Sequence, residues 1–138
     1  HVATLSGQRI GLPGADSDLD GMPDLWERRH GLDGATANDA NADADADGFS
    51  NHLEYIADTR PEDRDSHFEV KAILPGPPFE LRASMSSNRV YALYASSNLA
   101  TGTWTLISPP RPGTGDNDSM SNSNSAGGQF YRLQVRLP

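Results

Sequence analysis

The sequence predicts an α+β fold, in which two short loop–helix units are packed beside a small antiparallel β-sandwich. Three observations in the 138 residues lead to this fold class: an acidic segment that occurs twice, a helix-type sequence after each copy, and short alternating runs in the second half. They divide the chain into an N-terminal strand-like arm (1–15), the duplicated region (16–66) and the sandwich (67–138).

The acidic segment is a repeat without gaps. Residues 16–27 read DSDLDGMPDLWE and residues 43–54 read DADADGFSNHLE, at an offset of 27 residues (43 − 16). Two carboxylates about 5 Å apart repel each other by about 3 kcal/mol at an effective dielectric constant near 20. The same acidic positions occur in both copies, which is typical of a cation site. An unfolded acidic tail would not keep the same spacing of its carboxylates twice.

The spacing within each copy is that of a twelve-residue calcium loop. Such a loop supplies oxygen ligands from positions 1, 3, 5, 7, 9 and 12, with glycine at position 6 for a sharp turn. The first copy provides Asp16, Asp18, Asp20, the Met22 carbonyl, Asp24 through water and both oxygens of Glu27; the second provides Asp43, Asp45, Asp47, the Phe49 carbonyl, Asn51 and Glu54. Magnesium fits less well because it prefers a small octahedral shell, and zinc because the chain has no cysteine and only scattered histidines.

The last ligand of each loop must lie on a helix that begins inside the loop. PDLWERRHG fits this requirement, because Pro23 suits a first helical turn and Gly31 a helix end. SNHLEYIAD repeats the pattern, with Ser50 as the expected N-cap. A small core shared by the two helices is expected from Leu25, Trp26, Leu53 and Ile56, with Trp26 as a packing residue.

Neither loop follows a convincing helix, and Pro23 occupies position 8, which in paired EF-hands usually donates a backbone N–H to its partner. Residues 14–66 thereby resemble thrombospondin type-3 and dockerin repeats. The tract DGMPDLWERRHGLD…DADGFSNHLEYIADTRPED also resembles one common near the C-termini of large secreted bacterial proteins. The resemblance implies bound calcium. Asp39 and Asn41 continue the spacing of every second residue upstream of Asp43, so a third ion near these two residues is left open.

The negative net charge limits the classes of molecule that this protein is expected to bind. A net charge of −8 leaves no basic patch for nucleic-acid phosphates, and no apolar run approaches the roughly 20 residues of a membrane span. Nine of the 19 acidic residues lie in the two loops, so two calcium ions would offset half of the net charge. The chain begins with histidine, which we interpret as a mature secreted form or an excised fragment. Calcium loops of modest affinity suit an extracellular or cell-surface protein. The resemblance to secreted bacterial proteins implies a bacterial one.

After residue 66, five alternating runs predict an antiparallel sandwich: HFEVKAIL, FELRAS, RVYALYASS, TWTLIS and QFYRLQVRLP. The first run is expected to place Val70, Ala72 and Leu74 on its inner face, and the last Tyr131, Leu133 and Val135. Residues 108–129 are predicted to form a long polar loop, and the sequence also allows a short strand near 119–123. The strand order is similar to that of fibronectin type III-like, immunoglobulin-like or carbohydrate-module sandwiches.

No nucleophile elbow or other catalytic motif is present, so we expect a non-catalytic protein. The favoured hypothesis is a calcium-binding structural or adhesive module, in its sharpest form a fibre subunit whose N-terminal arm adds a strand to a neighbouring copy. The alternative is a carbohydrate-binding accessory module of a secreted bacterial enzyme. For that alternative the candidate aromatic residues are Trp104, Tyr91, Tyr94 and Phe130; Tyr94 and Trp104 are expected in the core, Tyr91 and Phe130 at the surface.

Overall fold

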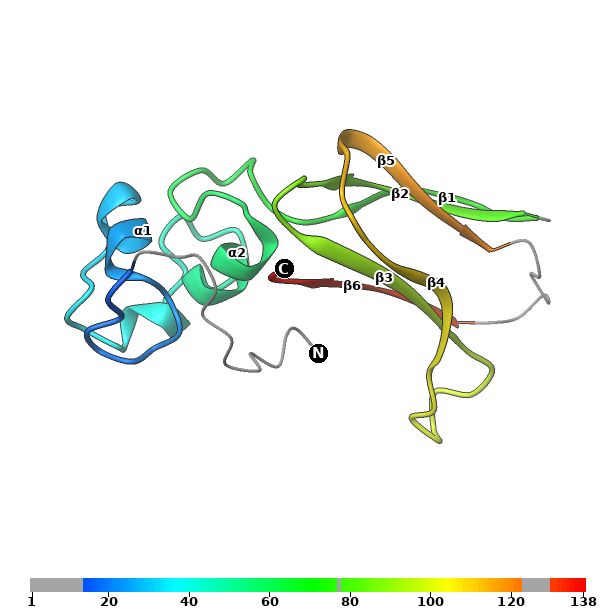
Figure 1. The fold of residues 1–138 in the computed structure, drawn as a ribbon, viewed down its shortest axis with the longest axis horizontal. Coiled ribbons are helices and arrows are strands. Elements are labelled where there is room, and N and C mark those ends of the chain that lie inside the picture. Colours follow the sequence, from blue (N-terminus) through cyan, green and yellow to red (C-terminus); the bar gives the residue numbers. More distant parts are fainter. Residues whose placement is uncertain (1–13, 77, 123–129) are drawn as a thin grey trace. The chain divides into compact units, whose positions relative to one another are not determined.

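The computed structural model describes residues 14–76, 78–122 and 130–138. Its chain divides into two compact units, with the division between His67 and Phe68 (Figure 1). Most of the expected N-terminal arm, residues 1–13, lies outside the described residues.

The first unit contains two short α-helices and a 3₁₀ turn: α1 (Asp24–Arg29), η1 (Asp39–Asn41) and α2 (Asn51–Ala57). Helix α1 ends at Gly31, whose φ of 75° is left-handed, and the Leu32 N–H donates to the Glu27 carbonyl to close the last turn. Helix α2 begins at Ser50, whose hydroxyl accepts a hydrogen bond from the Leu53 N–H, as the sequence predicts.

The small core of the first unit includes Ile56 and Trp26, as expected, but not the two expected leucines. Met22, Tyr55 and Ile56 are buried, and Trp26 of α1 packs edge-on against Tyr55 of α2 at a centroid distance of 5.1 Å. The packing role of Trp26 is therefore confirmed. Leu25 and Leu53 are 39% and 38% exposed, so their assignment to the core was wrong: each helix buries only one of its sides, and these leucines lie on the other.

The second unit is an antiparallel β-structure of two three-stranded sheets. One sheet has the order β1-β2-β5 and the other β4-β3-β6. The strands are β1 (Val70–Leu74), β2 (Phe79–Met85), β3 (Val90–Ser96), β4 (Thr105–Pro112), β5 (Gly115–Asn122) and β6 (Phe130–Arg136). Stacking of Phe79 in β2 on Tyr131 in β6, at 3.7 Å between centroids, joins the inner faces of the two sheets.

The polar segment expected as a loop instead contains most of two strands. Strand β4 continues to Pro112 and β5 begins at Gly115, so the chain crosses between the sheets within two residues. Asp118, which lies in this expected loop, is buried in β5 and accepts two hydrogen bonds from the Arg111 guanidinium, at 2.7 and 2.9 Å. This ion pair lowers the pKa of Asp118 to about 2 and satisfies a carboxylate inside a polar strand.

The inner faces of β2 and β6 follow the sequence pattern, whereas those of β3 and β1 do not. In β3 the buried tyrosine is Tyr91, which is fully buried and whose hydroxyl accepts from the Ser86 N–H, while Tyr94 is half-buried on the outer face. In β1 a bulge between Val70 and Ala72 brings Ile73, rather than Ala72, opposite inward-facing Leu81. Apolar residues occur on both faces of these strands, so alternation alone does not determine which face is inside.

Among the described residues, no helix combines the length and apolar character needed to cross a membrane.

The crossing between β4 and β5 yields a stability prediction. A Cβ on Gly113 would overlap the Met85 carbonyl, which is backbone and cannot move aside. We expect Gly113→Ala to lower the free energy of unfolding by about 1–3 kcal/mol, measured by thermal denaturation. Asp116→Ala, an exposed change three residues further on, should leave the melting temperature within about a degree. Equal melting temperatures for wild type and Gly113→Ala would contradict the close approach.

Candidate metal centre

The two acidic loops fold alike, because their hydrogen bonds repeat at the same offset of 27 residues. The Asp16 and Asp43 carboxylates accept from the N–H groups of Gly21 and Gly48 at 3.2 and 2.9 Å. The next bonds of the two loops also match: Met22 N–H to Asp20 and Phe49 N–H to Asp47, each at 2.8 Å. Position 4 has a left-handed φ in both loops, 63° at Leu19 and 62° at Ala46, and position 6 is glycine at 96° and 101°. Backbone N–H groups thus hold the carboxylates in a curved row.

The residues at position 9, Asp24 and Asn51, brace the loops. Asp24 accepts from the backbone N–H and the hydroxyl of Ser17, both at 2.7 Å, and these bonds lower the pKa of its carboxyl group. Asn51 is fully buried; its Oδ1 accepts from the Ala44 N–H at 3.3 Å, and its Nδ2 donates to the Asp39 carbonyl at 2.8 Å. Both side chains therefore have protein partners that hold the start of each loop against its helix.

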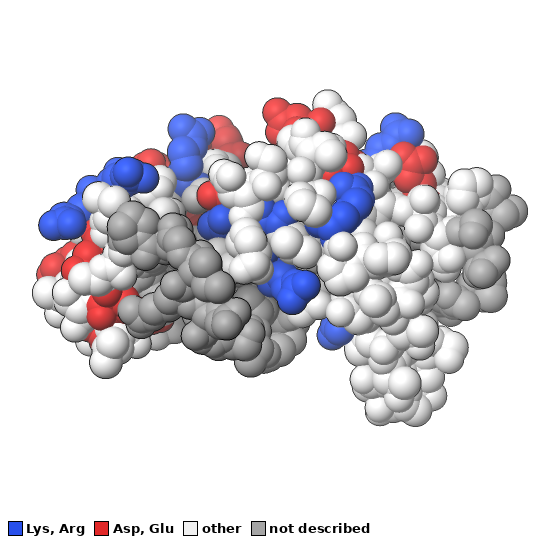
Figure 2. All heavy atoms as spheres, in the orientation of Figure 1, with Lys and Arg blue, Asp and Glu red and all other residues white. Residues whose placement is uncertain are grey.

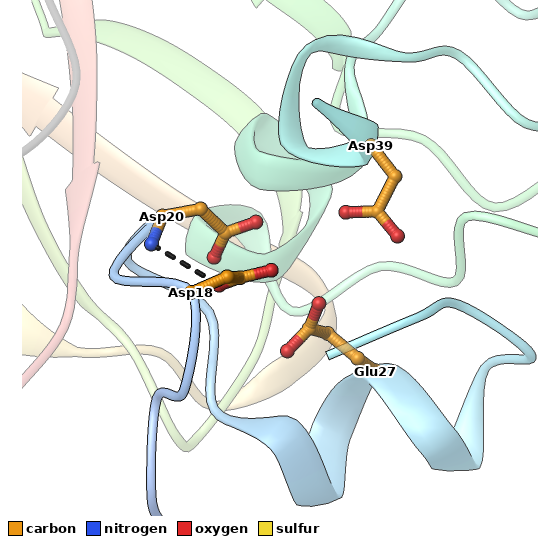
Figure 3. A group of neighbouring side chains, drawn as sticks. All are labelled: Asp18, Asp20, Glu27 and Asp39. Atoms are coloured by element: carbon orange, nitrogen blue, oxygen red, sulfur yellow. Dashed lines mark hydrogen bonds between the residues drawn. The ribbon is translucent and has the colours of Figure 1, made fainter. Parts of the chain in front are cut away.

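The first cluster consists of Asp18, Asp20, Glu27 and Asp39, which each place one carboxylate oxygen within 4.8 Å of the others (Figure 3). Asp18 and Asp20 come from the loop, Glu27 from α1 and Asp39 from η1, so three separate segments converge. In Figure 3 the carboxylates of Asp20, Glu27 and Asp39 point toward a common space, with Asp18 between the loop and the helix.

The second cluster consists of Asp43, Asp45 and Asp47, again within 4.8 Å of one another. Glu54 belongs beside it, since the charges of all three aspartates act on its carboxyl group, and the Thr59 hydroxyl donates to its Oε1 at 3.1 Å. His67 Nδ1 lies 3.6 Å from Asp47 Oδ2, and the imidazole stacks on Phe49.

Many oxygens of these residues are buried without a hydrogen-bond partner. Among the described residues, ten buried side-chain nitrogen and oxygen atoms have no partner, and nine of them are carboxylate oxygens of the two loops and Asp39. The nine oxygens belong to Asp16, Asp18, Asp20, Glu27 (both), Asp39, Asp45, Asp47 and Glu54. Buried polar atoms in native proteins are nearly always satisfied, so these concentrated exceptions mark the clusters as places that could hold a cation.

The two glutamates show the electrostatic cost most clearly. Glu27 is fully buried and Glu54 is 1% exposed. Burial, assisted by repulsion from neighbouring aspartates, raises the pKa of each carboxyl group to about 7. A divalent cation would reverse both causes, because it replaces the lost hydration and neutralises the repulsion. The donor set is entirely oxygen, so these clusters can hold a hard metal ion.

The sequence does not show to which cluster Asp39 contributes. Its spacing from Asp43 suggested a third ion shared with Asn41, but the structure brings the Asp39 carboxylate into the first cluster and leaves Asn41 exposed. The turn after Asp33, held by the Asp33 N–H donating to Asp39 Oδ2 at 2.9 Å, folds η1 back toward the first loop. The equivalent residue after the second loop is Ser66, so only the first cluster gains a fourth carboxylate.

The aromatic candidates for carbohydrate binding do not form an exposed row. Tyr91 is fully buried, contrary to expectation, and Phe130 is 43% exposed, as expected. Trp104 and Tyr94 are half-buried, not fully in the core, and both contact the guanidinium of Arg132, at 4.7 and 5.1 Å from the ring centroids.

A depression of about 490 Å³ lies over β3 and β4, lined mainly by Ser and Thr hydroxyls. The residues that line it include no aromatic side chain among those the structure describes. The loop between β3 and β4, residues 97–104, contributes to its lining, carries no charge and belongs to the white extension at the lower right of Figure 2. The depression can offer hydrogen bonds, but no aromatic ring face on which a sugar could stack.

No protein-family model matches this chain, and neither a curated protein nor a solved structure significantly similar to it was found. The site is therefore interpreted from its own geometry.

The raised glutamate pKa values predict the pH dependence of the metal-free protein. Between the ordinary value of 4.5 and about 7, the folded state keeps protons on Glu27 and Glu54 that the unfolded chain releases. Stability of the metal-free protein must then fall as the pH rises through this window. We expect a higher melting temperature at pH 5.5 than at pH 7.5 after exhaustive removal of divalent ions, and a smaller difference in Glu27→Gln/Glu54→Gln. A metal-free melting temperature that rises with pH would contradict the assignment.

Asp39 yields a second prediction that separates the clusters. Asp39→Asn removes a charge while the amide oxygen can still accept from the Asp33 N–H, so the fold should persist. We expect it to weaken divalent-ion binding at the first cluster about tenfold or more and to leave the second unchanged, as measured by titration calorimetry with two resolved sites. Asp33→Asn, which lies outside the cluster, serves as the control. Loss of affinity at the second cluster instead would place Asp39 elsewhere.

Proposed function

We propose that this protein is a non-catalytic, calcium-binding structural module of an extracellular protein, in which two calcium ions turn residues 16–66 into a rigid body. The observation that carries the proposal is the set of nine buried carboxylate oxygens without a hydrogen-bond partner among the described residues, eight of them in two loops of matched hydrogen bonding and one in Asp39. Clustered carboxylate oxygens of this kind are suited to binding a hard cation.

Calcium suits the clusters better than other hard ions do. It takes six to eight oxygen ligands at about 2.3–2.6 Å in a flexible shell, whereas magnesium demands a tight octahedron and keeps its waters. Each loop offers several aspartates and one glutamate on the following helix, with carbonyl oxygens available from the chain at Met22 and Phe49. The first cluster has a fourth carboxylate, that of Asp39 in η1, and this larger number of charged ligands favours calcium over magnesium.

The ions would act mainly on stability and shape. Without a cation, the clustered carboxylates repel one another across short distances, and the loops are stable only if some of them keep their protons. Binding removes this repulsion and ties each loop to its helix through Glu27 and Glu54. A protein that depends on calcium in this way fits surroundings where calcium is abundant, which supports an extracellular or cell-surface location.

The test is calcium titration with thermal denaturation. We expect calcium to raise the melting temperature, with a gain of about 4 kcal/mol per site at a thousandfold excess over the Kd. Glu27→Gln and Glu54→Gln should each remove one binding event in calorimetry, while Glu69→Gln, an exposed change in the other unit, should remove none. Melting temperatures that are identical with calcium and with chelator would refute the proposal, as would equal binding of magnesium.

A further inference from the structure

One of the ten buried atoms without a hydrogen-bond partner lies outside the acidic clusters: it is Nε of Arg132. Arg132 belongs to β6 and is remote in sequence from the two loops. A buried donor without an acceptor costs free energy, so its presence in a folded protein needs an explanation. The calcium clusters do not supply one.

Arg132 lies on the outer face of the sheet β4-β3-β6. The preceding residue, Tyr131, belongs to the inner face, because its ring stacks on that of Phe79 in the other sheet. Side chains alternate along a strand, so Arg132 points away from the core. Its direct partner in β3 is Tyr94, which therefore shares the outer face.

Two aromatic rings hold the guanidinium group of Arg132. Its central carbon lies over the ring of Tyr94, 5.1 Å from the centroid, and over the ring of Trp104, at 4.7 Å. Both distances are within the roughly 6 Å over which a cation is attracted to the face of a ring. The rings thus keep the planar group in place without neutralising its charge.

The terminal nitrogens Nη1 and Nη2 are the open end of this group. Arg132 makes no hydrogen bond or ion pair with any residue that the structure describes, and only its Nε is among the buried atoms without a partner. The two terminal nitrogens are therefore accessible to solvent. A guanidinium group held in this way offers two parallel N–H donors to a carboxylate, in a geometry that is fixed before binding.

The sheet around Arg132 is positively charged. Its three strands carry three arginines and neither aspartate nor glutamate. Arg111 is paired with Asp118 of β5, whereas Arg132 and Arg136 have no acidic partner among the residues that the structure describes. Arg132 and Arg136 lie on the same face of β6, four residues and about 13 Å apart. In a chain with a net charge of −8, this face is a local site for anions.

The positions next to Arg132 are apolar. Phe130 of β6 and Leu106, which pairs with Tyr94, are 43% and 45% exposed. A ligand that fits this face has an anionic group for the guanidinium and an apolar surface for the neighbouring side chains. A uronic acid has both, because its carboxylate is attached to a sugar ring whose C–H groups form an apolar face.

We propose that the outer face of β4-β3-β6 binds uronic acid units of an acidic polysaccharide. Arg132 pairs with one carboxylate, Phe130 contacts the sugar ring, and Arg136 pairs with a second carboxylate farther along the same polysaccharide. The negative charge of the whole protein disfavours densely charged nucleic acid, whereas carboxylates separated by neutral sugars interact with the local positive charge of the face. This binding site goes beyond the proposed calcium function and shares no residue with the acidic clusters.

The test uses a hyaluronan hexasaccharide, in which glucuronic acid alternates with a neutral sugar, and the methyl ester of the same hexasaccharide. In calorimetry in a calcium-containing buffer, we expect the ester to bind about tenfold more weakly than the acid, because esterification removes the charge that Arg132 recognises. Arg132→Gln should weaken binding of the acid about tenfold. Arg132→Lys, which keeps the charge but not the two parallel donors, should also weaken it. Arg82→Gln is the control, because it changes the net charge equally at an exposed position of the other sheet, and should bind as wild type does.

Phe130→Ala changes an exposed side chain and replaces Arg132→Gln if that variant does not fold; it too should weaken binding of the acid. Equal binding of acid and ester, wild-type affinity in Arg132→Gln, or no binding of the acid to wild type at millimolar concentration would overturn the inference. Tighter binding of a thymidine oligonucleotide than of the hexasaccharide would also overturn it, since the face would then suit nucleic acid. Calcium titration of the same samples tests the proposed function separately, because the two sites have no residue in common.

Discussion

The constraint on which the first unit depends is electrostatic. Several carboxylates are held within 4.8 Å of one another in each cluster by backbone N–H groups that leave other carboxylate oxygens unpaired. Repulsion between carboxylates this close opposes folding, and the stability of a small domain is itself marginal. Within residues 14–67 the unit has only two short helices and few buried apolar residues to offset this repulsion. Its structure is therefore governed by whatever neutralises these charges.

The sequence determines the local geometry of the loops well, because each ligand position is specified by its neighbours within twelve residues. The glycine at position 6, the Ser50 cap and the stop at Gly31 are local signals, and the structure contains all three. The role of Asp39 is not local. It depends on how the chain turns after Asp33, and the alternating ladder indicates an extra carboxylate without indicating which loop it joins.

The β-unit shows a similar limit. The inner face of β2 follows from its alternation, because charged Arg82 and Glu80 leave only one apolar face. Strand β3, VYALYAS, has apolar residues on both faces, and the choice is made by Tyr91, which contacts Phe68 and the Ser86 backbone. Strands β4 and β5 are hard to recognise because their sequence is polar, and the contact that joins them, Arg111 to Asp118, is an ion pair between residues seven apart in a segment without apolar alternation.

Asn51 links the second acidic loop to Asp39, a residue of the first cluster. One end of its amide holds the backbone of the second loop at Ala44, and the other holds the carbonyl of Asp39, whose carboxylate faces the first cluster. A single buried side chain thus ties the start of the second loop to Asp39, which completes the first cluster. A restraint on Asp39 therefore also restrains, through Asn51, the backbone at the start of the second loop.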